Sequence, residues 1–240
     1  MKRGILVKKY HVIIFIAVVI ILVIAVFPIQ RSPQREDTTA PQPVVAPIPG
    51  QEREETEIER LTREAAAHPD DPQIQYALGR ALLSRRRDAE ARTYLERAIT
   101  LEPGNVSAHD DLGVTFSHLG MYAEAVAEYE ATLRFTPDNV EVVYNLGTAY
   151  RHLDREDDAI DCFTKTLELD EHFYRAHNNL GGIYALRGDF DQAIEHFAAA
   201  LSINPNFVDA HQNLASVYTF LGDSAKAKEH IGAVESPGEP

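Results

Sequence analysis

From residue 71 onward the sequence repeats itself at intervals of 34 residues. A leucine followed by a small residue recurs five times, as Leu78-Gly79, Leu112-Gly113, Leu146-Gly147, Leu180-Gly181 and Leu214-Ala215. Twelve residues after each small residue comes an alanine, at Ala91, Ala125, Ala159, Ala193 and Ala227. Larger apolar residues lie three and sixteen residues after it, such as Phe116 and Tyr129 in the second copy. A fixed period of this length indicates a repeat architecture, in which each unit packs on its neighbours.

The pattern within one unit predicts two antiparallel helices. The small residue and the alanine leave room for the helices to cross closely, and the larger residues fill the remaining space. Gly120, Gly188 and Gly222 fall where the first helix should end, because glycine adopts left-handed backbone without a Cβ clash. Arg86 and Asp154 stand at that place in the first and third units. We expect their turns to have a different conformation.

Five units follow one another without insertion, at residues 71–104, 105–138, 139–172, 173–206 and 207–240. Residues 52–70 have a helical pattern in register with the second helix of a unit, which predicts a capping helix for the first unit. The predicted fold class is therefore an all-α superhelical solenoid of helix-turn-helix hairpins.

These spaced positions resemble the tetratricopeptide repeat (TPR) family, and the resemblance covers residues 71–240. It implies a superhelical array whose first helices line a concave groove for a peptide or protein segment. The groove residues that it indicates are polar or aromatic and lie on three first helices: Tyr144, Asn145, Thr148, Arg175, Asn178, Asn179, Gln212 and Asn213.

Asparagines recur at one groove position, as Asn145, Asn179 and Asn213. In the TPR family such an amide often bonds the backbone or terminal carboxylate of a bound peptide, because it both donates and accepts. The alternative is that it bonds a neighbouring helix. The family's carboxylate clamp also needs basic residues one helical turn earlier. Of the residues found there, Glu141, Arg175 and Asp209, only Arg175 fits, which favours a basic or neutral peptide.

Ten histidines raise the question of a metal site. His109, His177 and His211 recur at one position per unit, as do His118 and His152 at another. Equivalent atoms of neighbouring units lie about 10 Å apart, set by helix packing, whereas metal ligands lie about 2 Å from one ion. We therefore expect packing residues, no metal site and no cofactor, and leave a pH-sensing role open.

Composition and motifs exclude several classes of function. The net charge of −14 and the pI near 5.1 argue against nucleic-acid binding. Cys162 is the single cysteine, which excludes an intrachain disulfide, and its place on a packed helix predicts an inert thiol. The sequence holds no P-loop, dinucleotide-binding glycine pattern, zinc-protease motif or nucleophile elbow, so we expect no enzyme. Acidic residues are concentrated at 105–172. They form either a solvated face or a surface that attracts a basic partner.

The N-terminal region has a different character. Residues 1–9 are basic, and residues 10–29 form an apolar stretch long enough to cross a bilayer. The positive-inside rule places the N-terminus in the cytoplasm and the later residues across the membrane. A cleaved signal peptide is the alternative, but the apolar run is long and no small-residue cleavage site follows it. Residues 30–51 are rich in proline, which predicts an extended tether.

The sequence thus predicts a single-pass, signal-anchored membrane protein whose TPR array lies outside the cytoplasm, on the periplasmic side of a bacterial inner membrane. The expected function is a non-catalytic scaffold that binds a peptide or protein, with a basic segment favoured, to assemble an envelope, secretion or maturation complex. One alternative is an import-receptor-like subunit that binds basic targeting peptides. The other is a homo-oligomeric membrane scaffold.

Overall fold

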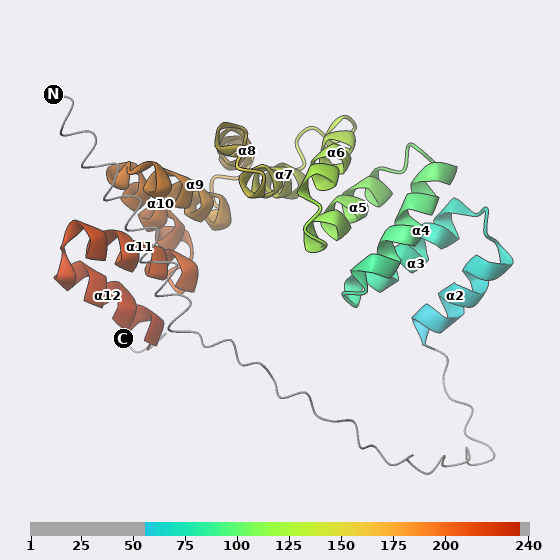
Figure 1. Ribbon diagram of the computed structural model, residues 1–240, viewed down its shortest axis with the longest axis horizontal. Coiled ribbons are helices and arrows are strands. Elements are labelled where there is room, and N and C mark those ends of the chain that lie inside the picture. Colours follow the sequence, from blue (N-terminus) through green and yellow to red (C-terminus); the bar gives the residue numbers. More distant parts are fainter. Residues whose placement is uncertain (1–55, 236–240) are drawn as a thin grey trace, which may run out of the picture. The chain divides into compact units, whose positions relative to one another are not determined.

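A computed structural model describes residues 56–235, in which there are eleven α-helices and no strand (Figure 1). The chain divides into two units, Met1–Arg53 and Glu54–Pro240, and the described residues all belong to the second. The predicted membrane span at 10–29 and the tether at 30–51 lie outside them. Among residues 56–235 no helix is both long enough and apolar enough to span a bilayer.

Within the described residues, a single helix comes first and five hairpins follow it (Figure 1). The single helix is α2 (Glu57–Ala67), and the hairpins are α3 (Pro72–Ser84) with α4 (Asp88–Leu101), α5 (Val106–His118) with α6 (Tyr122–Leu133), α7 (Val140–His152) with α8 (Glu156–Leu169), α9 (Tyr174–Arg187) with α10 (Phe190–Ile203), and α11 (Val208–Leu221) with α12 (Ser224–Glu235). The prediction of an all-α solenoid is confirmed.

Packing follows the order of the chain. The two helices of each hairpin contact each other, and each second helix contacts the first helix of the next hairpin. First helices also touch across hairpins, α3 with α5, α5 with α7 and α9 with α11, whereas no second helices make contacts of that extent. The first helices are therefore the more closely spaced row in the described part of the chain, which makes their shared face the inner one.

The small residue of the Leu-Gly pair lets the two helices of a hairpin approach closely. A Cβ atom on Gly113 would lie 2.6 Å from the Tyr129 ring, and one on Gly181 would lie 2.7 Å from the Phe197 ring. Both rings are 1% exposed, so they have little space to move away. The residue sixteen positions later thus occupies the volume that a side chain would need, which explains the glycine at this place.

The first helices of successive hairpins begin in two ways. Asn105 and Asn139 cap α5 and α7, accepting hydrogen bonds from the backbone N–H of the third helical residue. Phe173 and Phe207 stand at the same place before α9 and α11 and make no side-chain cap. Phe173 instead packs on Tyr144 of the preceding hairpin, with 4.8 Å between ring centroids. In the last two hairpins, apolar contact between units therefore replaces the polar cap.

Every hairpin turn uses one residue in the left-handed region. Gly120, Gly188 and Gly222 have φ of +74°, +82° and +82°, as predicted. The expectation of a different conformation at Arg86 and Asp154 is wrong, because their φ values are +59° and +57°. The physical reason is a shared hydrogen bond: the backbone N–H of the next residue donates to the carbonyl five positions earlier in all five turns, at 2.9–3.0 Å. That bond requires left-handed backbone whatever the side chain.

Replacing Asp154 by glycine is therefore expected to raise the free energy of unfolding by about 0.5–1 kcal/mol, because glycine adopts φ of +57° without a Cβ clash. Urea unfolding followed by circular dichroism measures the change. Gly188→Ala is the matched control, because it adds a Cβ atom at the same position of another turn. It should lower the free energy of unfolding by a similar amount. A neutral result for both variants would contradict this account of the turn.

Candidate functional site

The eight predicted groove residues lie on α7, α9 and α11, and five of them take part in contacts between hairpins. The Asn179 side-chain amide donates to the Tyr144 hydroxyl at 3.1 Å, and the Asn213 side-chain amide donates to the side-chain Oδ1 atom of Asn178 at 2.9 Å. The Arg175 guanidinium forms an ion pair with Glu141 at 3.2 Å. These bonds align one polar row across three first helices.

The asparagines differ in exposure. Asn179 is buried, so its bond to Tyr144 serves to join α9 to α7. Asn145, Asn178 and Asn213 are half-buried, and Gln212 is exposed. An amide has two donor hydrogens and an acceptor oxygen, so the Asn178–Asn213 contact leaves hydrogen-bonding capacity on both residues. The row therefore combines fixed contacts between helices with groups that can bind a ligand.

Two further predicted groove residues, Arg175 and Thr148, contact Tyr144. Arg175 lies over the Tyr144 and Phe173 rings, at 5.3 and 4.9 Å from their centroids, and its side chain remains 45% exposed. Thr148 donates to the Tyr144 backbone carbonyl within α7. The one predicted basic groove residue is thus held by Glu141 and by aromatic faces, and its charge is already partly compensated.

Acidic side chains extend the row onto α5. Asp110 and Asp111 occupy the positions equivalent to Tyr144 and Asn145. Burial, together with the charges of Asp111 and Glu141, raises the pKa of Asp110 to about 6. Burial also raises the pKa of Asp111, against a hydrogen bond from Tyr76 and the charge of Arg80, and its Oδ2 atom is buried without a hydrogen-bond partner. Negative charge in this part of the face is therefore incompletely compensated.

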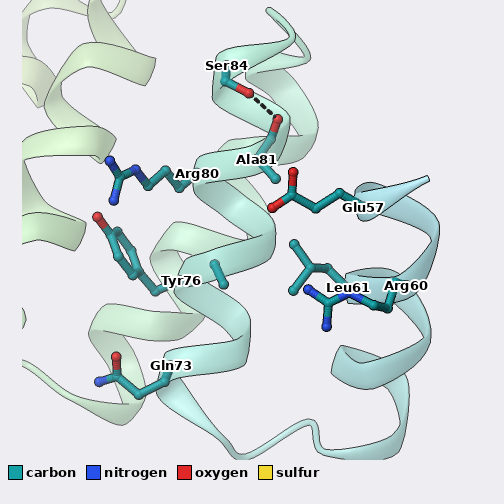
Figure 2. A pocket seen from close by; sticks show the side chains of 9 residues that line it. Glu57, Arg60, Leu61, Gln73, Tyr76, Arg80, Ala81 and Ser84 are labelled. Carbon is teal, nitrogen blue, oxygen red and sulfur yellow. Dashed lines mark hydrogen bonds between the residues drawn. The ribbon is translucent and has the colours of Figure 1, made fainter. Parts of the chain in front are cut away.

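The row begins at a pocket of about 470 Å³ between α2 and α3 (Figure 2). Its lining consists of Glu57, Arg60, Leu61, Gln73, Tyr76, Ala77, Arg80, Ala81 and Ser84. In Figure 2, Glu57 and Leu61 extend from α2 toward α3, whereas Tyr76 and Arg80 extend away from α2. Four of the α3 residues are equivalent to row positions of later hairpins: Gln73, Tyr76, Ala77 and Arg80. Among residues 56–235, no first helix precedes α2.

Comparison with protein families matches three tetratricopeptide repeat models to this chain, at residues 58–106, at 140–173 with 174–207, and at 196–229. Together these segments span more than half of the 240 residues. The chain is built of tetratricopeptide repeats. No curated protein sequence matched it.

Several solved protein structures have a similar fold. A TPR protein from Parabacteroides merdae has a TM-score of 0.64 at 23% identity, over 76% of this chain and 72% of that one. YrrB, described as a TPR protein with an unusual peptide-binding site, has a TM-score of 0.59 at 25% identity, over 74% and 91%. MamA from Desulfovibrio magneticus has a TM-score of 0.59 at 24% identity, over 62% and 85%.

Within the TPR hairpins, the structure places the histidines in contacts that the sequence reasoning missed. The Nδ1 atoms of His177 and His196 lie 3.1 Å apart, and those of His211 and His230 lie 3.0 Å apart. In the second repeat, His109 bonds Glu128. The partner lies nineteen residues later in each case, on the second helix of the same hairpin. Sequence reasoning compared histidines only between repeats, and a spacing of nineteen would have revealed the pairs.

The other recurring histidines join neighbouring repeats. His118 contacts Asp88 at 2.8 Å and Arg86 at 2.9 Å in the preceding hairpin. His152 stacks on Tyr122, with 4.1 Å between ring centroids.

Burial and the charges of nearby aspartates raise the pKa of Cys162 to about 12, which opposes thiolate formation. In the described part of the chain, no three His, Cys, Asp or Glu side chains are grouped to hold a metal.

Asp110 gives a pH-dependent prediction. Its folded pKa of about 6 lies above the unfolded value of about 3.9, so the folded TPR array binds more protons. Its contribution to stability is therefore present at pH 3–4 and is lost as pH rises through 6. Asp110→Asn should unfold at higher urea concentration than the native chain at pH 7.5, with the difference shrinking toward pH 4. A constant difference across this range would contradict the assigned ionisation.

Proposed function

We propose that the protein is a non-catalytic TPR scaffold whose first-helix face binds a cationic segment of a partner protein. The observation that carries the proposal is the acidic group on this face, Asp110 and Asp111 beside Glu141. Burial, followed by the like charges of Asp111 and Glu141, raises the pKa of Asp110, and one Asp111 oxygen is buried without a hydrogen-bond partner. A lysine or arginine of a ligand would compensate this charge, because charge-assisted hydrogen bonds are among the stronger polar contacts.

The polar row provides the rest of the recognition. A peptide backbone presents alternating N–H and C=O groups, and half-buried amides can bond both. Asn145, Asn178 and Asn213 lie on successive first helices and suit this role. The description of YrrB as having a peptide-binding site supports a peptide ligand for this type of fold.

A library of random peptides displayed on phage, selected on the full-length chain, tests the ligand class. We expect enrichment of peptides that contain lysine and arginine. Asp110→Asn combined with Asp111→Asn should weaken binding of a selected peptide by at least about tenfold, since loss of each charged hydrogen bond is worth about 1.5–3 kcal/mol. Asp138→Asn is the matched control, because Asp138 is exposed and lies in the turn between α6 and α7. Equal binding by native and doubly substituted chains would refute the groove assignment.

For the cellular setting, we propose the placement that the N-terminal sequence predicts. The basic residues 1–9 and the apolar residues 10–29 support an uncleaved anchor, with the TPR array outside the cytoplasm, where it would assemble an envelope, secretion or maturation complex. A C-terminal fusion to a reporter that is active only outside the cytoplasm should be active. Activity of a cytoplasm-specific reporter would instead favour an import-receptor-like role, with the same groove binding basic targeting peptides.

A further inference from the structure

The last two repeats each contain two histidines whose Nδ1 atoms face each other. His177 on α9 faces His196 on α10, and His211 on α11 faces His230 on α12. The other described repeats lack such a pair. The second repeat has Glu128 opposite His109, and the third has Cys162 opposite Val143. The fourth and fifth repeats therefore share one arrangement of two facing imidazole nitrogens, and these histidines are not among the groove residues.

A backbone carbonyl fixes the proton on one histidine. The Nε2 atom of His211 lies 2.9 Å from the Pro205 carbonyl oxygen, which can only accept, so this nitrogen carries the proton. The Nδ1 atom of neutral His211 therefore carries an electron pair, which accepts the hydrogen bond from the His230 Nδ1–H. Metal-binding histidines typically donate their other N–H to a backbone carbonyl in this way.

The distances suit coordination of one ion by both rings. Imidazole nitrogens lie about 2.0–2.1 Å from a bound zinc, so two ligands at angles between 90° and tetrahedral are about 2.9–3.4 Å apart. The observed separations of 3.0 and 3.1 Å lie in this interval. Moving the His230 proton from Nδ1 to Nε2 gives a second free electron pair. Neither ring needs to lose its remaining proton to solvent.

Aromatic packing holds the second ring of each pair. Tyr184 stacks on His196 and Tyr218 stacks on His230, with interplanar angles of 7° and 1°. The four histidines are only half-buried, so water can complete the coordination of an ion. A ligand pair held in one geometry loses less conformational freedom on binding than mobile side chains do.

We propose that each histidine pair, His177 with His196 and His211 with His230, binds one divalent transition-metal ion of the class that prefers imidazole. Cu²⁺ is the tightest-binding ion of this class in the Irving–Williams order, with Ni²⁺ and Zn²⁺ weaker. Since the pairs join the two helices of one hairpin, a bound ion would cross-link the last two repeats internally. The site is independent of the peptide groove.

The test is a titration of the full-length chain, purified without a histidine tag, with Cu²⁺ alone. Isothermal calorimetry should give two equivalents, and electron paramagnetic resonance should show two nitrogen ligands for each ion. His196→Gln and His230→Gln should each lose one equivalent. His118→Gln is the control and should keep both, because His118 bonds Asp88 and Arg86 instead.

A gain-of-site variant completes the test. Glu128→His places a histidine opposite His109. The Nε2 atom of His109 lies 3.1 Å from the Pro103 carbonyl oxygen, as the Nε2 atom of His211 lies 2.9 Å from the Pro205 carbonyl oxygen. It should add a third equivalent, a result that does not depend on the loss variants being folded. Failure of the native chain to take up Cu²⁺ would refute the proposal. So would unchanged stoichiometry in both His196→Gln and His230→Gln, or no added equivalent in folded Glu128→His.

Discussion

Replacing Phe163 by alanine is expected to lower the free energy of unfolding by about 3–5 kcal/mol. The Phe163 side chain is fully buried in the middle of the array, where it packs on Gly147 and on the Tyr144 ring. Its removal leaves a cavity between α7 and α8 that a backbone held by neighbours on both sides cannot close. Urea unfolding followed by circular dichroism measures the loss.

Phe135 provides the matched control, because its side chain is 58% exposed and Phe135→Ala should change stability by no more than about 0.5 kcal/mol. The position of Phe163 also predicts a change in cooperativity. Each hairpin packs mainly on its neighbours, so weakening the third one should uncouple the two ends of the array. A single sharp transition with a loss below 1 kcal/mol would contradict both expectations.

Two adjacent glycines on α9 should respond to alanine with opposite signs. At Gly181, a Cβ atom would lie 2.7 Å from the buried Phe197 ring, so Gly181→Ala should destabilise the chain by about 1–3 kcal/mol through overpacking. At Gly182, no atom lies within 4 Å of the added carbon. Because alanine favours helix over glycine, Gly182→Ala should stabilise the chain by about 0.5–1 kcal/mol.

Thermal and urea unfolding of the two variants under identical conditions test this difference. Both substitutions add one methyl group to the same helix, so helix propensity contributes equally and the contrast isolates the contact with Phe197. The explanation of the Leu-Gly pair would fail if Gly181→Ala were as stable as Gly182→Ala. The double substitution of Gly181 by alanine and Phe197 by leucine should recover part of the loss.

The repeating part of the fold could be predicted from the sequence because its determinants are local and recur five times. Gly113 with Tyr129, for example, encodes the close approach of two helices at a fixed spacing. The conformation of Asp154 was predicted wrongly because residue preference was considered without the hydrogen bond that all five turns share. Here the backbone requirement of the turn overrides the preference of the side chain.

For the candidate groove, the sequence predicts only which residues share a position in the repeat. The repeat assigned Asn145, Asn179 and Asn213 to one face, but it could not distinguish buried Asn179 from the half-buried other two. Only the packed structure shows that Asn179 donates to the Tyr144 hydroxyl of the preceding hairpin at 3.1 Å. The pKa of Asp110 is raised first by burial, then by the charge of Asp111 and then by that of Glu141, a residue of another helix.

The nearest-neighbour packing has a consequence for how such a chain can change in length. Every junction between hairpins joins equivalent positions 34 residues apart, so removing residues 139–172 would bring the end of α6 to the start of α9 with corresponding surfaces in contact. The shortened array would lose Glu141, which is the ion-pair partner of Arg175. Length and charge along the inner face can therefore vary in whole units, by a single insertion or deletion, without a new core having to arise.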